Sequence, residues 1–297
     1  MNYDVIIPIS DRTSTILPIA IDSIKKYLQG VKAVKLIGRS DLERFAIDLG
    51  CCFVDEDKLY SGLTYKALDD LILLRNITSD RTGWYFQQFL KMAYSLSCDD
   101  EYYLVWDADL VLLNKLEMFD PDKHPYFDFK TEYHKPYFST INRLFGYRTI
   151  ERKRNISFIA EHMLIKSDYM RSMINDICNN HELKGDLFFE KIISAIRGVD
   201  IPGSGFSEFE TYGNYVDNKF PETYTFRRNK TLREGELFLG NNPSSVYLDW
   251  AAKSFDLINF ECRKEMIEDL KNNIEEIMKK KSLYEVAMEH SNLIEYW

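Results

Sequence analysis

The apolar run Tyr102–Trp106 (YYLVW) limits the possible folds of this chain more than any other segment. All five side chains are large and hydrophobic, so a strand formed there presents apolar groups to both faces of its sheet. Strands of this kind lie in the centre of parallel sheets that are covered by helices. Asp107 and Asp109 follow the run directly. We therefore expect an α/β sheet in which a central strand ends in two carboxylates.

The segments before this run alternate between strand and helix patterns. In chain order they are a strand at 3–9, a helix at 15–28, a strand at 33–38, a helix at 40–49, a strand at 51–54 and a helix at 84–97. Alternation at these intervals is typical of parallel-sheet units. The pattern predicts an α/β fold with a mixed, mainly parallel sheet and helices on both faces.

The second half of the chain continues this pattern less regularly. The residues at 125–147 are rich in Phe and Tyr, and we expect them to line a pocket. Next come a strand at 158–165, a helix from Ser167 and a helix at 186–197. A flexible Gly203-Ser204-Gly205 loop precedes a capping box, Ser207-x-x-Glu210, which predicts the start of another helix. We expect one domain over 1–255 and a helical extension over 256–297 packed on it.

Composition excludes several classes of protein. Of the 297 residues, 45% are hydrophobic, which is too many for a disordered chain. The formal net charge of −9 argues against a nucleic-acid partner. The five cysteines contain no C-x-x-C pair, so we expect neither a disulfide framework nor a zinc site. We expect the protein to lie in the reducing cytoplasm. The first residues resemble neither a signal peptide nor a membrane anchor, and no run approaches a membrane span.

The two carboxylates after the central strand carry most of the chemical information. Ligands of open α/β sheets collect outside the carboxyl ends of the strands, which is where Asp107 and Asp109 lie. Carboxylate oxygens combined with substrate phosphates are a usual way to hold Mg²⁺ or Mn²⁺. Such an ion would stabilise a diphosphate as a leaving group. The alternative is a pair of solvated acids in a turn.

The segment YYLVWDADLVLL resembles the D-x-D segment of the GT-A class of nucleotide-sugar glycosyltransferases. Five segments resemble, in order, those of bacterial GT-A glycosyltransferases associated with surface-polysaccharide synthesis; they lie at 82–92, 106–113, 132–138, 158–164 and 207–215. The resemblance extends over about 3–250. It implies a GT-A-like fold with a nucleotide-sugar half (about 1–115) and an acceptor half (about 116–255).

The same resemblance implies an activity. It is metal-dependent transfer of a sugar from a nucleotide-sugar donor, expected to be a UDP-sugar, to a glycan or lipid-linked glycan in capsule or O-antigen synthesis. Asp107 and Asp109 would be ligands of Mn²⁺ or Mg²⁺, and Asp107 would also contact the donor. The loop with Ser10, Asp11 and Arg12 would lie beside the nucleoside; the alternative for Arg12 is an exposed charge in a turn.

The helix before the D-x-D strand carries two further candidates for donor binding. Gln87 and Lys91 are four residues apart and share one helix face. The ammonium group of Lys91 could contact donor phosphate or sugar oxygens. A solvated polar stripe would have the same pattern.

Two acids in SEFETYGN are candidates for the general base that an inverting transferase requires. In a capping box the carboxylate of Glu210 turns back to the backbone of Ser207, which leaves Glu208 the freer acid. Glu208 could instead be a first-turn acid that interacts with the helix dipole. In a retaining enzyme it would only orient the sugar.

Histidine and tyrosine side chains complete the expected site. His162 is a candidate third metal ligand, with a hydrogen-bonded core histidine as its alternative. We expect His134, Tyr137 and Tyr212 to contact the acceptor, with core packing as the alternative for the aromatic rings.

Two other functions are compatible with parts of the sequence. LVWDADLVL also satisfies the motif of haloacid-dehalogenase-like phosphatases, although that motif normally lies near the start of a chain. A non-catalytic sugar-nucleotide-binding protein would keep the same pocket. The tail at about 261–281 ends in three lysines, so peripheral contact with the inner face of the membrane is possible, but its many acids favour packing on the domain.

Overall fold

The computed structural model describes residues 1–10, 15–147, 149–261 and 264–291. The chain forms two compact units, each assembled from three stretches of sequence. The first unit comprises Met1–Pro8, Lys32–Val105 and Phe119–Arg227, and the second comprises Ile9–Val31, Trp106–Met118 and Arg228–Trp297. These two units interleave along the sequence. The domain boundary expected near residue 255 stays a prediction.

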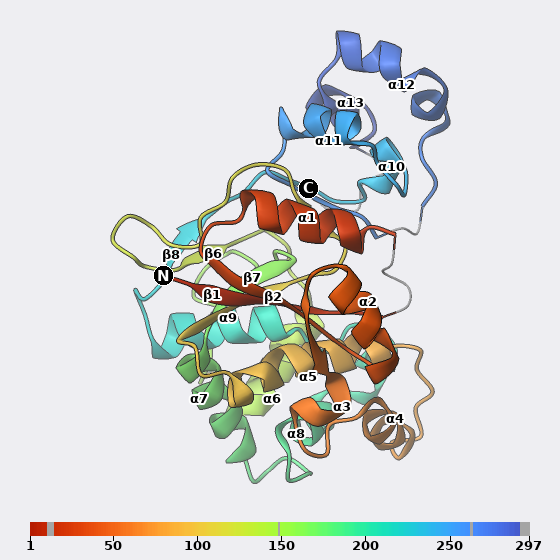
Figure 1. The fold of residues 1–297 in the computed structure, drawn as a ribbon. Coiled ribbons are helices and arrows are strands. Elements are labelled where there is room, and N and C mark those ends of the chain that lie inside the picture. Colours follow the sequence, from red (N-terminus) through yellow and green to blue (C-terminus); the bar gives the residue numbers. More distant parts are fainter. Residues whose placement is uncertain (11–14, 148, 262–263, 292–297) are drawn as a thin grey trace. The chain divides into compact units, whose positions relative to one another are not determined.

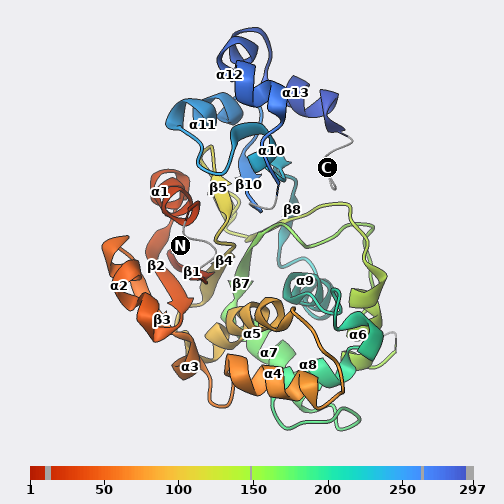
Figure 2. The same ribbon diagram turned by 90° about the vertical axis from the view of Figure 1, so that its right-hand side faces the viewer.

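The first unit contains a five-stranded sheet with the order β3-β2-β1-β4-β7; β1, β2 and β7 are labelled in Figure 1, and β3 and β4 in Figure 2. The strands are β1 (Tyr3–Pro8), β2 (Val31–Gly38), β3 (Cys52–Asp55), β4 (Tyr102–Trp106) and β7 (His162–Lys166). β1 is parallel to β4, with Val5 opposite Leu104, and β2 is parallel to β3. Every residue of β1 and β4 is buried, as the unbroken apolar run predicts. The mixed, mainly parallel α/β fold is confirmed.

Eight α-helices are described in this unit. They are α2 (Glu43–Asp48), α3 (Glu56–Leu59), α4 (Tyr65–Leu73), α5 (Thr82–Ser97), α6 (Lys135–Phe145), α7 (Ser167–Cys178), α8 (Phe188–Ala195) and α9 (Glu208–Lys219). α5 packs against β1, α4, α7 and α9, and most of its residues are buried (Figure 2). The core beside it is rich in aromatic rings such as Phe89, Phe188 and Phe206. A helix with neighbours on several sides can place polar side chains in the interior of the unit.

The aromatic segment at 125–147 is more regular than its sequence pattern suggests. It contains β6 (Tyr126–Asp128), which pairs in parallel with β8 (Thr225–Arg227), and it contains α6. A proline in the first turn favours the start of α6, and Gly146, with φ of 84°, ends it. The strand expected at 158–165 begins only at His162, because Glu161 has φ of 57° and interrupts the extended backbone.

The second unit contains a smaller sheet with the order β5-β10-β9. Its strands are β5 (Leu110–Leu112), β9 (Thr231–Leu232) and β10 (Leu257–Asn259), and its described helices are α1 (Leu17–Tyr27), α10 (Glu236–Leu239), α11 (Ser245–Ala252), α12 (Glu268–Lys280) and α13 (Leu283–Glu289). β10 is antiparallel to β5, with Asn259 opposite Leu110. α1 packs on β5, where Ser23 Oγ accepts a hydrogen bond from the Leu112 amide at 3.0 Å.

The apolar face of the tail helix is covered within the second unit. Leu270 and Ile274 of α12 are buried in the core of that unit. Lys280 pairs with Glu276, and Lys281 pairs with Glu289. Within the described residues, no helix is both long and apolar enough to cross a membrane.

Candidate active site

The two aspartates lie in a turn of the second unit, between β4 and β5. The Leu110 amide donates to the Asp107 carbonyl at 3.1 Å, and the indole nitrogen of Trp106 donates to the Leu110 carbonyl at 2.8 Å. Ala108 is buried, whereas Asp107 and Asp109 are each partly exposed. The turn is therefore closed by hydrogen bonds and anchored by its alanine, and the two acids keep access to solvent.

Asn259 holds the second of these acids and was not anticipated from the sequence. Its Nδ2 donates to Asp109 Oδ1 at 3.0 Å, and the amide of the next residue, Phe260, donates to the Asp109 carbonyl at 2.9 Å. Asn259 is 5% exposed, and its Oδ1 has no hydrogen-bond partner among the described residues. A buried amide oxygen without a donor is unfavourable, and a cation or a ligand N–H or O–H group would relieve it.

This donor set suits a hard divalent cation. Carboxylate and amide oxygens are the ligands that Mg²⁺ and Mn²⁺ favour, usually with oxygens from water or substrate phosphates. Within the described residues, no group of three or more His, Cys, Asp or Glu side chains could hold an ion by itself. Two carboxylates and one amide oxygen at this turn fit such a cation only if further oxygens come from water or from a bound molecule.

The first loop gives little further information. Ser10 is exposed, whereas Asp11 and Arg12, the other candidates for contact with the nucleoside, lie outside the described residues. Their expected role stays a prediction.

Lys91 and Glu208, expected in separate roles, form a buried ion pair in the first unit. Lys91 Nζ lies 2.8 Å from Glu208 Oε1, and the two side chains are only 4% and 6% exposed. The ammonium group also lies 4.6 Å from the centroid of the Phe209 ring. Burial of two charges is favourable only when they are well paired, so each side chain fixes the ionised form of the other.

Gln88, the neighbour of Gln87 in the sequence, connects the same two helices. Its Oε1 accepts from the Glu208 amide at 3.0 Å, and its Nε2 donates to the Trp84 carbonyl at 3.1 Å. Gln88 is buried, whereas Gln87, which we expected to contact the donor, is partly exposed. Gln88 therefore binds one of the backbone amides at the start of α9 that have no partner within that helix.

Glu210 does not form the capping box that its spacing predicts. The Ser207 hydroxyl accepts from the Glu210 amide, but the carboxylate accepts from Ser157 Oγ at 2.7 Å, the Phe158 amide at 3.1 Å and Asn214 Nδ2 at 3.0 Å. Burial raises the pKa of Glu210, and these hydrogen bonds offset only part of that effect. Its carboxylate ties α9 to the segment before β7. The geometry gives it a structural task rather than that of a base.

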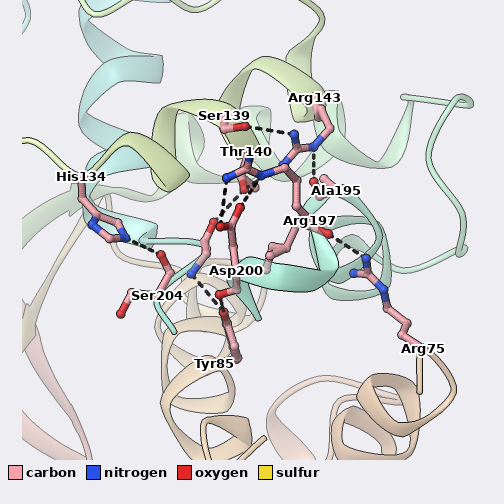
Figure 3. A network of polar contacts seen from close by, with 12 residues as sticks. Arg75, Tyr85, His134, Ser139, Thr140, Arg143, Ala195, Arg197, Asp200 and Ser204 are labelled. Atoms are coloured by element: carbon pink, nitrogen blue, oxygen red, sulfur yellow. Dashed lines mark hydrogen bonds and ion pairs between the residues drawn. The ribbon is translucent and has the colours of Figure 1, made fainter. Parts of the chain in front are cut away.

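The loop that leads into α9 is held in place, contrary to the flexibility expected of Gly203-Ser204-Gly205. His134 Nε2 lies 2.8 Å from the Ser204 carbonyl, and the Gly205 amide donates to the Tyr85 hydroxyl at 3.1 Å (Figure 3). The Gly205 carbonyl accepts from Thr140 Oγ1 at 2.7 Å. A Cβ on Gly205 would lie 2.3 Å from Ile196 Cγ2, so the glycine is required for close packing.

His162 lies in a buried network rather than at an open metal position. Its Nδ1 lies 2.8 Å from the Ala160 carbonyl and its Nε2 lies 2.8 Å from Asp128 Oδ2. Arg227, opposite Asp128 in the β6–β8 pair, donates twice to the same carboxylate at 2.7 Å. Burial raises the pKa of Asp128, but hydrogen bonds and charge from Arg227 and His162 outweigh it and lower that pKa to about 2. Both ring nitrogens face acceptors, which is the core role given above as the alternative.

The tyrosines expected at the acceptor differ in position. Tyr137 is largely buried beside the His134 ring, with 4.4 Å between ring centroids. Burial and the negative charge of Glu208 raise the pKa of Tyr137 to about 12, although a hydrogen bond with Ser204 lowers it. Tyr212 is fully buried, and its hydroxyl accepts from the Lys166 amide at 2.9 Å and contacts the Tyr224 hydroxyl at 3.0 Å. Tyr212 is thus a core residue without surface for an acceptor.

Comparison with known proteins gives distant likenesses only. No family model matches the sequence, and no curated protein matches it. Among solved structures, the chain is similar to mouse xyloside xylosyltransferase 1 (11% identity, 90% of this chain and 100% of that chain, TM-score 0.48). It is also similar to the bifunctional glycosyltransferase WbbM (11% identity, 97% and 51%, TM-score 0.47) and to the galactosyltransferase LgtC with donor and acceptor sugar analogs (11% identity, 87% and 87%, TM-score 0.42). The chain spans about half the length of WbbM.

Proposed function

We propose that this protein is a glycosyltransferase that moves a sugar from a nucleotide-sugar donor, of the UDP class, to a glycan or lipid-linked glycan. The observation that carries the proposal is the oxygen cluster of the second unit. Asp107 and Asp109 flank one buried alanine, Asn259 holds Asp109, and the Asn259 Oδ1 lacks a partner among the described residues. A role in bacterial surface-polysaccharide synthesis is part of the proposal.

The ion proposed at this cluster is Mg²⁺ or Mn²⁺. When bound, it would neutralise charge on the diphosphate that leaves the donor sugar. The residues of the chain contribute by orientation: the Nδ2 of Asn259 fixes one oxygen of Asp109. The buried Oδ1 of Asn259, which has no hydrogen-bond partner among the described residues, is a further oxygen in the proposed ligand set. Residues that orient metal ligands commonly change metal affinity by about 10–100-fold when they are removed.

Glu208 is the base in this proposal if the reaction inverts configuration. The ion pair with Lys91 favours the carboxylate form, which is the form that accepts a proton from the acceptor hydroxyl. Lys91 binds this carboxylate, and Gln88 accepts a hydrogen bond from the backbone amide of the same residue at the start of α9. If the reaction retains configuration, Glu208 orients the sugar and accepts no proton.

The metal-dependent step is tested by Asp109→Asn. Calorimetric titration with Mn²⁺ and a panel of UDP-, GDP- and CMP-sugars should show metal-dependent donor binding in the parent protein and none in the variant. Asp249→Asn, which changes an exposed acid of the same unit, is the matched control and should bind as the parent does. Asn259→Ala should weaken the binding by at least about tenfold. Undiminished affinity in Asp109→Asn would refute the proposed ion site.

A second assay separates transfer from the other functions. Slow donor hydrolysis with Mn²⁺ supports a transferase, and Glu208→Gln should slow transfer to an acceptor without weakening donor binding. Donor binding without hydrolysis or transfer would favour a non-catalytic binding protein. Release of phosphate from a generic monoester would favour a phosphatase.

A further inference from the structure

A pocket of about 240 Å³ lies in the first unit, lined in part by the aromatic segment at 125–147 that we expected to line a pocket. Three aromatic residues and three planar polar residues line it: Tyr133, Phe138, Tyr147, Asn142, Glu151 and Arg152. Pockets that enclose a drug-sized ligand have volumes of roughly 300–1,000 Å³. This one is smaller, which suits a single ring.

The aromatic walls of the pocket are unusually accessible to solvent. Tyr133 is 58% exposed and Tyr147 is 75% exposed, although most large aromatic side chains of this unit are buried. The rings of Tyr133 and Phe138 are nearly parallel, at 16°, with centroids 5.0 Å apart. Clustered exposed rings are unfavourable in water and mark binding surfaces. The flat apolar surface that they offer is complementary to the C–H face of a pyranose ring.

The polar walls offer hydrogen bonds that the described chain does not use. Neither the Asn142 amide nor the Glu151 carboxylate has a side-chain hydrogen bond within the described residues. Arg152 is held differently, because it donates to the Ile156 carbonyl at 3.1 Å and lies 4.8 Å from the centroid of the Tyr133 ring. One amide and one carboxylate provide a donor and acceptors for hydroxyl groups.

The backbone around the pocket is well anchored. Phe138 and Asn142 are four residues apart on α6 and therefore share a face of that helix. On the other side, the Glu151 amide donates to Asn218 Oδ1 at 3.3 Å and the Glu151 carbonyl accepts from Asn218 Nδ2 at 2.8 Å. The side chains are thus presented by a helix and by a loop that α9 fixes.

We propose that this pocket binds one neutral pyranose residue of the glycan acceptor. Arg152 and Glu151 carry opposite charges, so the pocket lining has no net charge and offers an acidic sugar no advantage over a neutral one. The segment that carries the pocket also leads to Glu208: Tyr133 lines the pocket, and the next residue, His134, holds the loop that enters α9 (Figure 3). The inference rests on the proposed function only in that the bound sugar belongs to an acceptor.

Ligand-observed NMR tests the pocket directly. Saturation transfer is measured from the full-length protein to the methyl pyranosides of glucose, galactose, mannose and N-acetylglucosamine, with methyl glucuronide as the acidic comparison. We expect at least one neutral pyranoside to bind, and at least as tightly as the glucuronide. Tyr147→Ala should weaken that binding about fivefold, as expected for loss of one aromatic contact, and Asn142→Ala should weaken it as well. Tyr65→Ala, which removes another exposed tyrosine (49% exposed) on α4, is the control and should not change the binding.

The outcomes separate this inference from the proposed function. The inference is overturned if no neutral pyranoside binds the parent protein, or if Tyr147→Ala and Asn142→Ala bind as the parent does. Calorimetry with UDP and Mn²⁺ on the same variants should give parent-like binding. Failure of the parent to bind UDP and Mn²⁺ refutes the proposed function instead. In a transfer assay, Tyr147→Ala should raise KM for an oligosaccharide acceptor and leave kcat unchanged.

Discussion

Replacement of Lys91 by methionine should cost the first unit much of its stability. Methionine keeps the length of the side chain but leaves the Glu208 carboxylate, 6% exposed, without its cation at 2.8 Å. At that separation the pair interaction is about 6 kcal/mol for an effective dielectric constant of 20. The variant no longer pays the cost of burying the Lys91 ammonium group, which offsets part of this energy. Removal of one partner of a buried ion pair typically lowers the free energy of unfolding by about 3–5 kcal/mol. We expect Lys91→Met to lower the free energy of unfolding by that amount at pH 7.

The measurement is a double-mutant cycle in urea with Lys91→Met, Glu208→Gln and the double variant. The double variant buries no unpaired charge, so it should be more stable than Lys91→Met despite carrying one more change. Additive effects of the two substitutions, to within about 0.5 kcal/mol, would refute the reasoning.

Two further predictions concern the packing and the charges of the first unit. Gly213→Ala should destabilise α9 although alanine is the better helix former, because the new Cβ would lie 2.1 Å from the Phe158 ring; Gly83→Ala, whose nearest contact is 3.8 Å, should be neutral or stabilising in thermal unfolding. Asp128, with its pKa lowered to about 2, should contribute about 2 kcal/mol above pH 4 that is lost as pH falls toward 2. In urea unfolding experiments at several pH values, Arg227→Met should reduce this loss of stability between pH 4 and pH 2. An unchanged loss would contradict the proposed effect of Arg227 on the pKa of Asp128.

The elements that follow local patterns were predictable from the sequence. The apolar run Tyr102–Trp106 is the buried strand β4, and the residues expected as a helix at 84–97 lie in α5. The segment with α6 was missed because its aromatic residues obscure the helical period. The late start of β7, after Glu161, depends on one backbone angle that residue type does not predict.

The polar partners of the site were less predictable because they depend on contacts between distant segments. Lys91 and Glu208 were each singled out, but nothing local indicates that they are paired. Asn259 faces Asp109 only because β10 lies beside β5. A polar residue inside the apolar run at 257–260 is the one local signal that could have drawn attention to it. The partners of Glu210 were mispredicted because Ser157 and Asn214 compete with the local capping box.

The interleaving of the two units has a consequence for biosynthesis. α1 is synthesised before most of the core that covers it: Ala20 of α1 and the adjacent Ile16 are buried together with Trp250 and Leu270 from the last stretch of the second unit. Strand β1, by contrast, can pair as soon as its neighbours β2 and β4 have emerged. The first unit can thus begin to assemble during translation, while the apolar face of α1 stays uncovered until the residues after 228 have been made.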